Sequence, residues 1–137
     1  MKNSETNKKN FKAEIINILA ENEIKARNTR DEISQYFLTA IIERIKLFDN
    51  KNFLEQIGWL VDSLEKGKRP TTKILEETAN VIFGIIKDSP EMLGDEIDAL
   101  NSISGILEIP GDLANDEADL ETFMGRIGYF LNSWKRR

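Results

Sequence analysis

Apolar residues recur along this chain at the three- and four-residue spacing of amphipathic helices. Residues 1–10 precede the first such pattern and are polar, so they predict a flexible polar tail, whereas residues 11–137 predict one helical domain. No stretch alternates apolar and polar residues for long enough to predict a sheet. The pattern therefore predicts an all-α, single-domain bundle of five to six amphipathic helices.

The first three helices are predicted at residues 11–26, 29–48 and 51–66. Asn10 and Thr29 are expected to be the N-caps of the first two helices. Gly67 is expected to end the third in the left-handed conformation. The residues expected to face the core are Phe11, Ile15, Ile18, Leu19, Ile33, Tyr36, Phe37, Ala40, Ile41, Ile45, Phe48, Phe53, Leu54, Ile57, Leu60, Val61 and Leu64.

The fourth helix is expected to begin at a cap formed by Thr71 or Thr72. Its apolar stripe is wide, which predicts a central helix that is buried on much of its surface. Ser89, followed by Pro90 and Glu91, has the composition of a helix start and predicts the beginning of the fifth helix. The inward-facing residues expected in these two helices are Ile74, Leu75, Thr78, Val81, Ile82, Phe83, Ile85, Ile86, Leu93, Ile97, Leu100, Ile103 and Leu107.

Pro110 and Gly111 are expected to end the fifth helix, and residues 112–118 to form a loop or a short turn. The sixth helix is predicted at residues 116–134. Gly125 and Gly128 are expected to leave room for a neighbouring helix to approach it closely. The residues expected on its core face are Leu120, Phe123, Met124, Ile127, Phe130, Leu131 and Trp134.

The composition restricts the chemistry that this chain can perform. There is no Cys and no His, which argues against disulfides, zinc sites and catalysis by Ser-His or Cys-His pairs. No apolar run approaches the roughly 20 residues of a membrane span, and no secretory signal is apparent. We therefore expect a cytoplasmic protein that does not bind membranes.

Charge is distributed unevenly along the sequence. Residues 88–125 contain eleven acidic residues and no Lys or Arg, whereas residues 1–87 contain 15 basic and 13 acidic residues. Solvated protein surfaces usually mix both signs, so this one-signed stretch either forms an ordinary solvated face or binds a partner of opposite charge. The net charge of −5 and the absence of a basic stripe argue against direct binding of nucleic acid.

These observations favour a non-enzymatic protein-binding domain. In its most concrete form, it is an inhibitor or immunity-type antagonist whose acidic face covers the basic cleft of a nucleic-acid-processing protein. The expected partner is a basic protein, and no cofactor or metal ion is expected. The expected partner-binding residues are Asp95, Glu96, Asp98, Asp112, Asp116, Glu117, Asp119 and Glu121.

Two binding alternatives remain open at this point. One is a helical adaptor or a self-associating subunit, with the face around Gly125 and Gly128 as the contact in a homo-oligomer.

The other is a calcium loop that starts at Asp112. It fails the EF-hand pattern, because Ala114 stands at the third position and Glu117 stands where glycine is required.

An enzyme is a further alternative. Leu75-Glu76-Glu77, followed by the segment from Leu93 to Asp98, resembles the paired acidic helices of all-α nucleotide pyrophosphohydrolases of the MazG type. The resemblance implies Mg²⁺-dependent hydrolysis of a nucleotide and requires that Glu76, Glu77, Asp95 and Asp98 converge. The chain departs from the family pattern at Asn80 and Met92, where that pattern has acidic residues.

Overall fold

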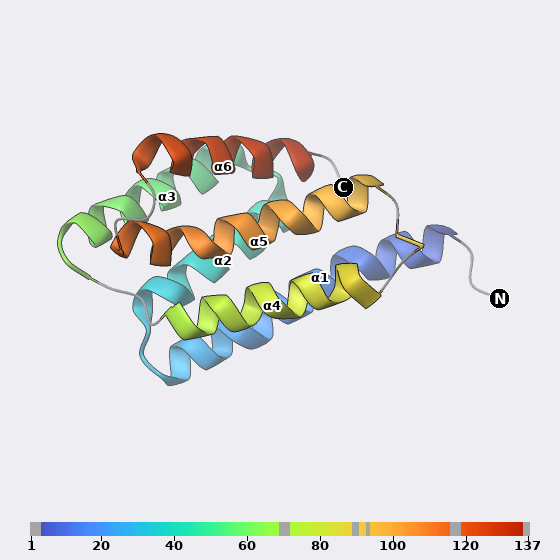
Figure 1. The fold of residues 1–137 in the computed structure, drawn as a ribbon, viewed down its shortest axis with the longest axis horizontal. Helices are drawn as coiled ribbons and strands as arrows, with labels where there is room; N and C mark the ends of the chain where they lie inside the picture. Colours follow the sequence, from blue (N-terminus) through green and yellow to red (C-terminus); the bar gives the residue numbers. More distant parts are fainter. Residues whose placement is uncertain (1–3, 69–71, 89–90, 93, 116–118, 136–137) are drawn as a thin grey trace.

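The computed structural model describes residues 4–68, 72–88, 91–92, 94–115 and 119–135, with backbone alone for residues 4–11, 72 and 114. Over this part of the chain it contains six helices and no strand (Figure 1). The helices are α1 (Ser4–Asn28), α2 (Glu32–Leu47), α3 (Asn50–Glu65), α4 (Thr72–Asp88), α5 (Gly94–Ala114) and α6 (Leu120–Ser133). The prediction of an all-α helical bundle is confirmed.

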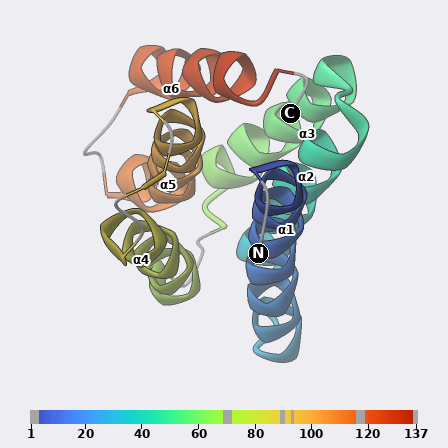
Figure 2. The ribbon, with the colours of Figure 1, turned by 90° about the vertical axis from the view of Figure 1, so that its right-hand side faces the viewer.

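Helix α5 lies between α4 and α6, also contacts α3, and runs antiparallel to α4 and α6 (Figure 1 and Figure 2). It buries residues over most of its length, including Leu100, Ile103 and Ile109, each at 0% exposure. The prediction that α4 is central is wrong. Helix α4 lies at the edge of the bundle (Figure 2) and leaves Val81 and Phe83 exposed on either flank of its buried stripe.

The cap predicted at Thr29 is also wrong. Helix α2 begins two residues later than expected, and its N-cap is Asp31, which accepts a hydrogen bond from the Ser34 N–H at 3.1 Å. The Thr29 hydroxyl instead donates to carbonyl oxygens in the last turn of α1. Arg30 lies between these two residues with φ of 60°, so the turn reverses through a left-handed residue that is not glycine.

Of three other helix ends predicted from the sequence, one is confirmed and two are wrong. Gly67 ends α3 with φ of 87°, as predicted. Helix α1 already includes residues 4–10, so Asn10 lies inside it and is not its N-cap; the flexibility of residues 1–10 stays a prediction. Glu91 is not helical and α5 begins at Gly94. The caps assigned to Thr71 and Ser89 lie outside the described residues.

Pro110 does not end α5, because the helix continues to Ala114. Proline removes one backbone donor and normally interrupts a helix. Here Ile109 and Pro110 are buried, and Arg126 of α6 forms an ion pair with Asp112 at 3.0 Å. Burial and this ion pair hold the last turn in place, so the predicted loop at residues 112–118 starts later than expected.

Most of the predicted core residues are buried or half-buried, apart from Phe11 and Leu93, whose side chains lie outside the described residues. The exposed exceptions are Phe48, Leu54, Val81, Phe83, Leu120 and Met124. Apart from Phe48, which lies in the link after α2, these exceptions belong to the broad apolar stripes of their helices. The helical period indicates a stripe but does not tell which of its flanks a neighbouring helix will cover.

Candidate functional site

The predicted acidic residues are divided between two ends of α5. Asp95, Glu96 and Asp98 lie in its first turns, with Asp95 and Asp98 exposed and Glu96 half-buried. The last turn of α6 lies beside them, because the Trp134 indole Nε1–H donates to the Ala99 carbonyl oxygen at 2.9 Å. This group therefore sits at the end of the bundle where α6 finishes (Figure 1).

The second group lies at the opposite end of α5. It consists of Asp112 near the end of α5, Asp119 at the cap of α6 and Glu121 in the first turn of α6. At about 1.5 Å per residue, Asp98 and Asp112 are about 21 Å apart along the helix. The predicted residues therefore do not form one compact group; Asp116 and Glu117 lie outside the described residues.

A closer gathering of charge is found where α5 ends, and we name Glu76, Glu108 and Asp112 the acidic cluster. Partial burial raises the pKa of Glu108, and the negative charges of Asp112 and Glu76 raise it further. Arg126 acts in the opposite direction and lowers this pKa, and it bonds directly to Asp112 at 3.0 Å. The acidic cluster thus has a local excess of negative charge.

Sequence reasoning did not assign Glu76 and Glu108 to the acidic binding surface. Glu76 belongs to α4, outside the stretch that lacks basic residues, and only the antiparallel packing of α4 on α5 brings it to the end of α5. Glu108 was visible as one of eleven acids, but nothing in its local sequence distinguished it. The spacing of Glu108 and Asp112, which are one helical turn apart, was the feature of the sequence that could have indicated their proximity.

Asp119 has a structural role at the start of α6, and this role explains why an acidic residue stands at this position. Its carboxylate accepts a hydrogen bond from the Thr122 N–H at 2.8 Å and forms the N-cap of α6. The bonds from the Thr122 backbone and hydroxyl lower the pKa of Asp119, so it remains ionised down to more acidic pH. A partner of positive charge is not required to explain this residue.

The acidic residues required for a nucleotide hydrolase are not brought together. Glu76 lies near the start of α4 and contributes to the field at Glu108, whereas Asp95 and Asp98 lie at the far end of α5. Within the described ranges, no group of three or more acidic residues has the geometry of a metal site. The convergence that the MazG-type resemblance requires is therefore not met.

Gly125 and Gly128 face open space. A Cβ atom built at either position would have no neighbour within 4 Å outside the adjoining backbone of α6, so none of the other helices that the structure describes approaches them, contrary to the prediction. Met124 and Tyr129, on the same helix, are 49% and 47% exposed. We name these four residues the outer face of α6.

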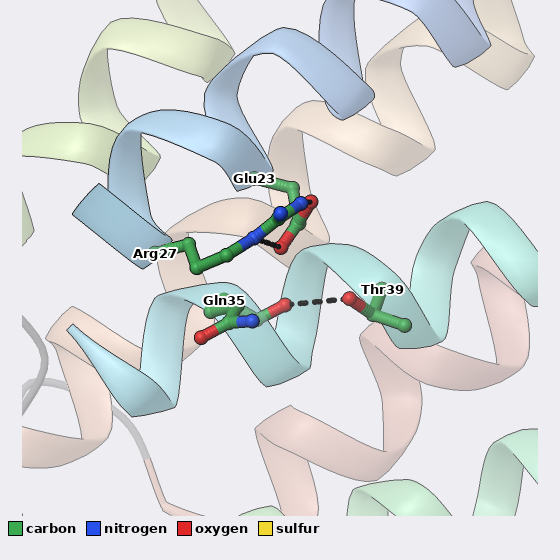
Figure 3. Close-up of polar contacts among 4 residues, drawn as sticks. All are labelled: Glu23, Arg27, Gln35 and Thr39. Carbon is green, nitrogen blue, oxygen red and sulfur yellow. Dashed lines mark hydrogen bonds and ion pairs between the residues drawn. The ribbon is translucent and has the colours of Figure 1, made fainter. Parts of the chain in front are cut away.

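Polar groups between α1 and α2 are satisfied within their own helices (Figure 3). The Arg27 guanidinium donates two hydrogen bonds to Glu23, the shorter at 2.6 Å, and this contact raises the pKa of Arg27. The Thr39 hydroxyl donates to the Gln35 carbonyl oxygen at 2.9 Å. These contacts stabilise single helical turns and do not form a binding site.

The geometry defines the described part of the chain as a six-helix, all-α bundle in which the predicted acidic residues that the structure describes lie at the two ends of α5. Comparison with protein-family models, with curated proteins and with solved structures finds no match to this chain. Among the helices that the structure describes, none combines the length and apolar character needed to cross a membrane.

Proposed function

We propose that this chain is a non-enzymatic, cytoplasmic protein-binding domain. It acts as an inhibitor or immunity-type antagonist that covers a basic surface on a nucleic-acid-processing partner. The observation that carries this proposal is the acidic cluster, in which Glu108 is exposed to a partner, loses part of its hydration and lies in the field of two other carboxylates. Such an arrangement is unfavourable in the isolated protein, and a cation supplied by a partner would relieve it.

The geometry favours one end of α5 over the other as the contact. At the end where α5 finishes, acidic residues come from α4, α5 and α6, with Glu121 exposed in addition to the acidic cluster. At the other end, Asp95, Glu96 and Asp98 all come from α5. A surface built from three helices offers a wider charged area to a folded partner than one helical turn.

The experiment is a pull-down from the lysate of the source cell, with salt raised in steps. One bait variant carries Glu76→Gln, Glu108→Gln and Glu121→Gln. The matched control variant carries three neutral substitutions at the other end of α5 and has the same net charge: Asp95→Asn, Glu96→Gln and Asp98→Asn. Circular dichroism first establishes that both variants retain the helical content of the wild type.

We expect the wild type and the control variant to hold a basic protein at low salt and to release it as salt rises. The variant at the acidic cluster should lose this protein. Purified partner should then be inhibited by the wild type in a nuclease or nucleic-acid-binding assay. If both variants hold the same partner as strongly as the wild type does, the acidic residues are a solvated face and the proposal is wrong.

A second candidate function is self-association through the outer face of α6. It is favoured by the exposure of Met124 and Tyr129 and by the open space at Gly125 and Gly128, where the backbone of a second copy can approach. Light scattering after size exclusion, at several protein concentrations, measures it. A dimer that Tyr129→Lys converts to a monomer supports this function, whereas a monomer at all concentrations rules it out.

A further inference from the structure

A positively charged side chain lies inside the apolar contact surface of α2. Arg44 is 3% exposed and follows Ile41 along the buried stripe of this helix. Its Nη2 donates to the Leu131 carbonyl oxygen at 3.3 Å, in the last turn of α6. Its Nε and Nη1 are buried and have no hydrogen-bond partner. Because a guanidinium stays protonated in proteins, Arg44 keeps a buried charge with two unsatisfied donors.

A second cation and an aromatic ring lie at the same place. The Lys12 ammonium is 4.6 Å from the centroid of the Phe48 ring, and the Arg44 guanidinium carbon is 5.5 Å from that centroid. Burial lowers the pKa of both cations, and the charge of Arg44 lowers that of Lys12 further. Arg44 forms no salt bridge within the part of the chain that the structure describes.

Phe48 is held in an unusual way. It has φ of 54°, in the left-handed region that bulky residues rarely adopt, and its N–H donates to the Arg44 carbonyl oxygen at 3.0 Å. Phe48 is 37% exposed as a residue, while both cations lie near its ring. The negative face of an aromatic ring attracts cations, and the Phe48 ring therefore takes the position that an anion would occupy.

We propose that Lys12 and Arg44 form a binding site for a small oxyanion, which takes the place of the Phe48 ring. The space that the ring would leave adjoins both cations, because the Lys12 ammonium is 4.6 Å and the Arg44 guanidinium carbon 5.5 Å from the ring centroid. Oxygen atoms of phosphate or carboxylate accept hydrogen bonds from both groups and neutralise their charge. This site is independent of the acidic cluster.

The ligand is small because the site is closed. The Arg44 Nε and Nη1 atoms have essentially no accessible surface, so an occupant that takes the place of the ring must be about as small as the ring itself. Inorganic phosphate and acetate are the probes, because phosphate represents a phosphoryl ligand, acetate represents a carboxylate ligand, and both offer oxygen acceptors. If phosphate raises the thermal unfolding midpoint more than acetate does, the ligand is a phosphoryl group. If the two raise it equally, a carboxylate is a sufficient ligand.

The test is the thermal unfolding midpoint, measured against sodium phosphate, sodium acetate and sodium chloride at equal ionic strength. Ligand that binds only the folded state raises the midpoint as its concentration increases. We expect the wild type to respond to phosphate more than to chloride and Arg44→Met to lose this difference. Lys12→Met should weaken it. The control Lys73→Met, which removes an exposed lysine of α4, should keep the wild-type response.

Phe48→Ala separates a binding site from a purely structural role. Since the ring competes with the anion, its removal should tighten phosphate binding several-fold even if the variant is less stable. Titration of phosphate by phosphorus NMR measures this affinity directly and replaces the thermal assay if Arg44→Met does not fold. Equal effects of phosphate and chloride on the wild type, or unchanged phosphate affinity in both Lys12→Met and Phe48→Ala, would overturn the proposal.

Discussion

The turn between α1 and α2 offers a direct test of how this fold is stabilised. Asp31 is 5% exposed and caps α2, and its two carboxylate oxygens accept from the Ser34 N–H at 3.1 Å and from the Ser34 hydroxyl at 2.6 Å. Thr29, two residues earlier, has the side chain of a good cap but is exposed and bonds to α1 instead. We predict that Asp31→Ala destabilises the protein far more than Thr29→Ala.

The magnitude follows from two losses. Removing an N-cap acceptor costs about 0.5–2 kcal/mol. The Ser34 hydroxyl is at 0% exposure and loses its acceptor, which costs about 1–3 kcal/mol. The sum, about 1.5–5 kcal/mol, is a large share of the roughly 5–15 kcal/mol by which folded domains are stable. Thr29→Ala removes the hydroxyl of an exposed residue, which donates one exposed and one partly buried hydrogen bond to α1, and should cost about 0.5 kcal/mol.

The assay is urea unfolding followed by helical circular dichroism, for the two single variants and for Asp31→Asn. The asparagine variant keeps an acceptor for the cap and should recover much of the lost stability. Adding Ser34→Ala to Asp31→Ala removes the stranded hydroxyl and should restore about 1 kcal/mol. If Thr29→Ala lowers the free energy of unfolding as much as Asp31→Ala does, the assignment of the cap is refuted.

Three further predictions concern single side chains. Arg30→Gly should stabilise the protein by about 1 kcal/mol, seen as a higher unfolding temperature, because φ of 60° is strained for any residue except glycine. Trp134→Phe should cost about 1 kcal/mol in urea unfolding, because it removes the 2.9 Å hydrogen bond to the Ala99 carbonyl oxygen while the Ser102 hydroxyl still donates to that oxygen at 2.6 Å, whereas Tyr129→Phe on the exposed face should change little. The pKa of Glu108 is raised in the folded state, so protonation of its carboxyl stabilises the folded protein. This contribution is fully present below the unfolded pKa, about 4.3, and is lost as pH rises through the folded pKa. Glu108→Gln should therefore match the wild type in stability near pH 4 and exceed it at pH 7, and equal stability at both pH values would contradict the assigned environment.

Helix boundaries show where local sequence is sufficient and where it fails. Gly67 ended α3 as predicted, because glycine alone adopts the left-handed conformation without strain and the signal is local. Pro110 was predicted to end α5 and did not, because contacts with α6 outweigh the lost backbone donor. Arg30 closes α1 in the left-handed conformation although no local signal marks it, since the packing of α1 against α2 requires a sharp reversal there.

The candidate binding sites, like the helix boundaries, were predictable from the sequence only in part. The excess of acidic residues over 88–125 was visible in the sequence, but the residues separate to two ends of α5 because that helix is long and continuous. Glu76 joins Glu108 only through the antiparallel packing of α4 on α5. Arg44 stands within the apolar stripe of α2 and was detectable as a charged residue at a core position. Its two unsatisfied donors became apparent only in the structure.

The sequence by itself determined the class of fold, a range of five to six helices and most of the core, because the spacing of apolar residues along a helix is a local property. The lack of Cys and His in the sequence also argues against disulfides, zinc sites and catalysis by Ser-His or Cys-His pairs, since that follows from residue types alone. Only the tertiary structure decided that α5 lies between α4 and α6, which flank of each apolar stripe is covered, and which charges meet. Those features depend on how helices far apart in the chain pack against one another, and helical periodicity carries no information about that packing.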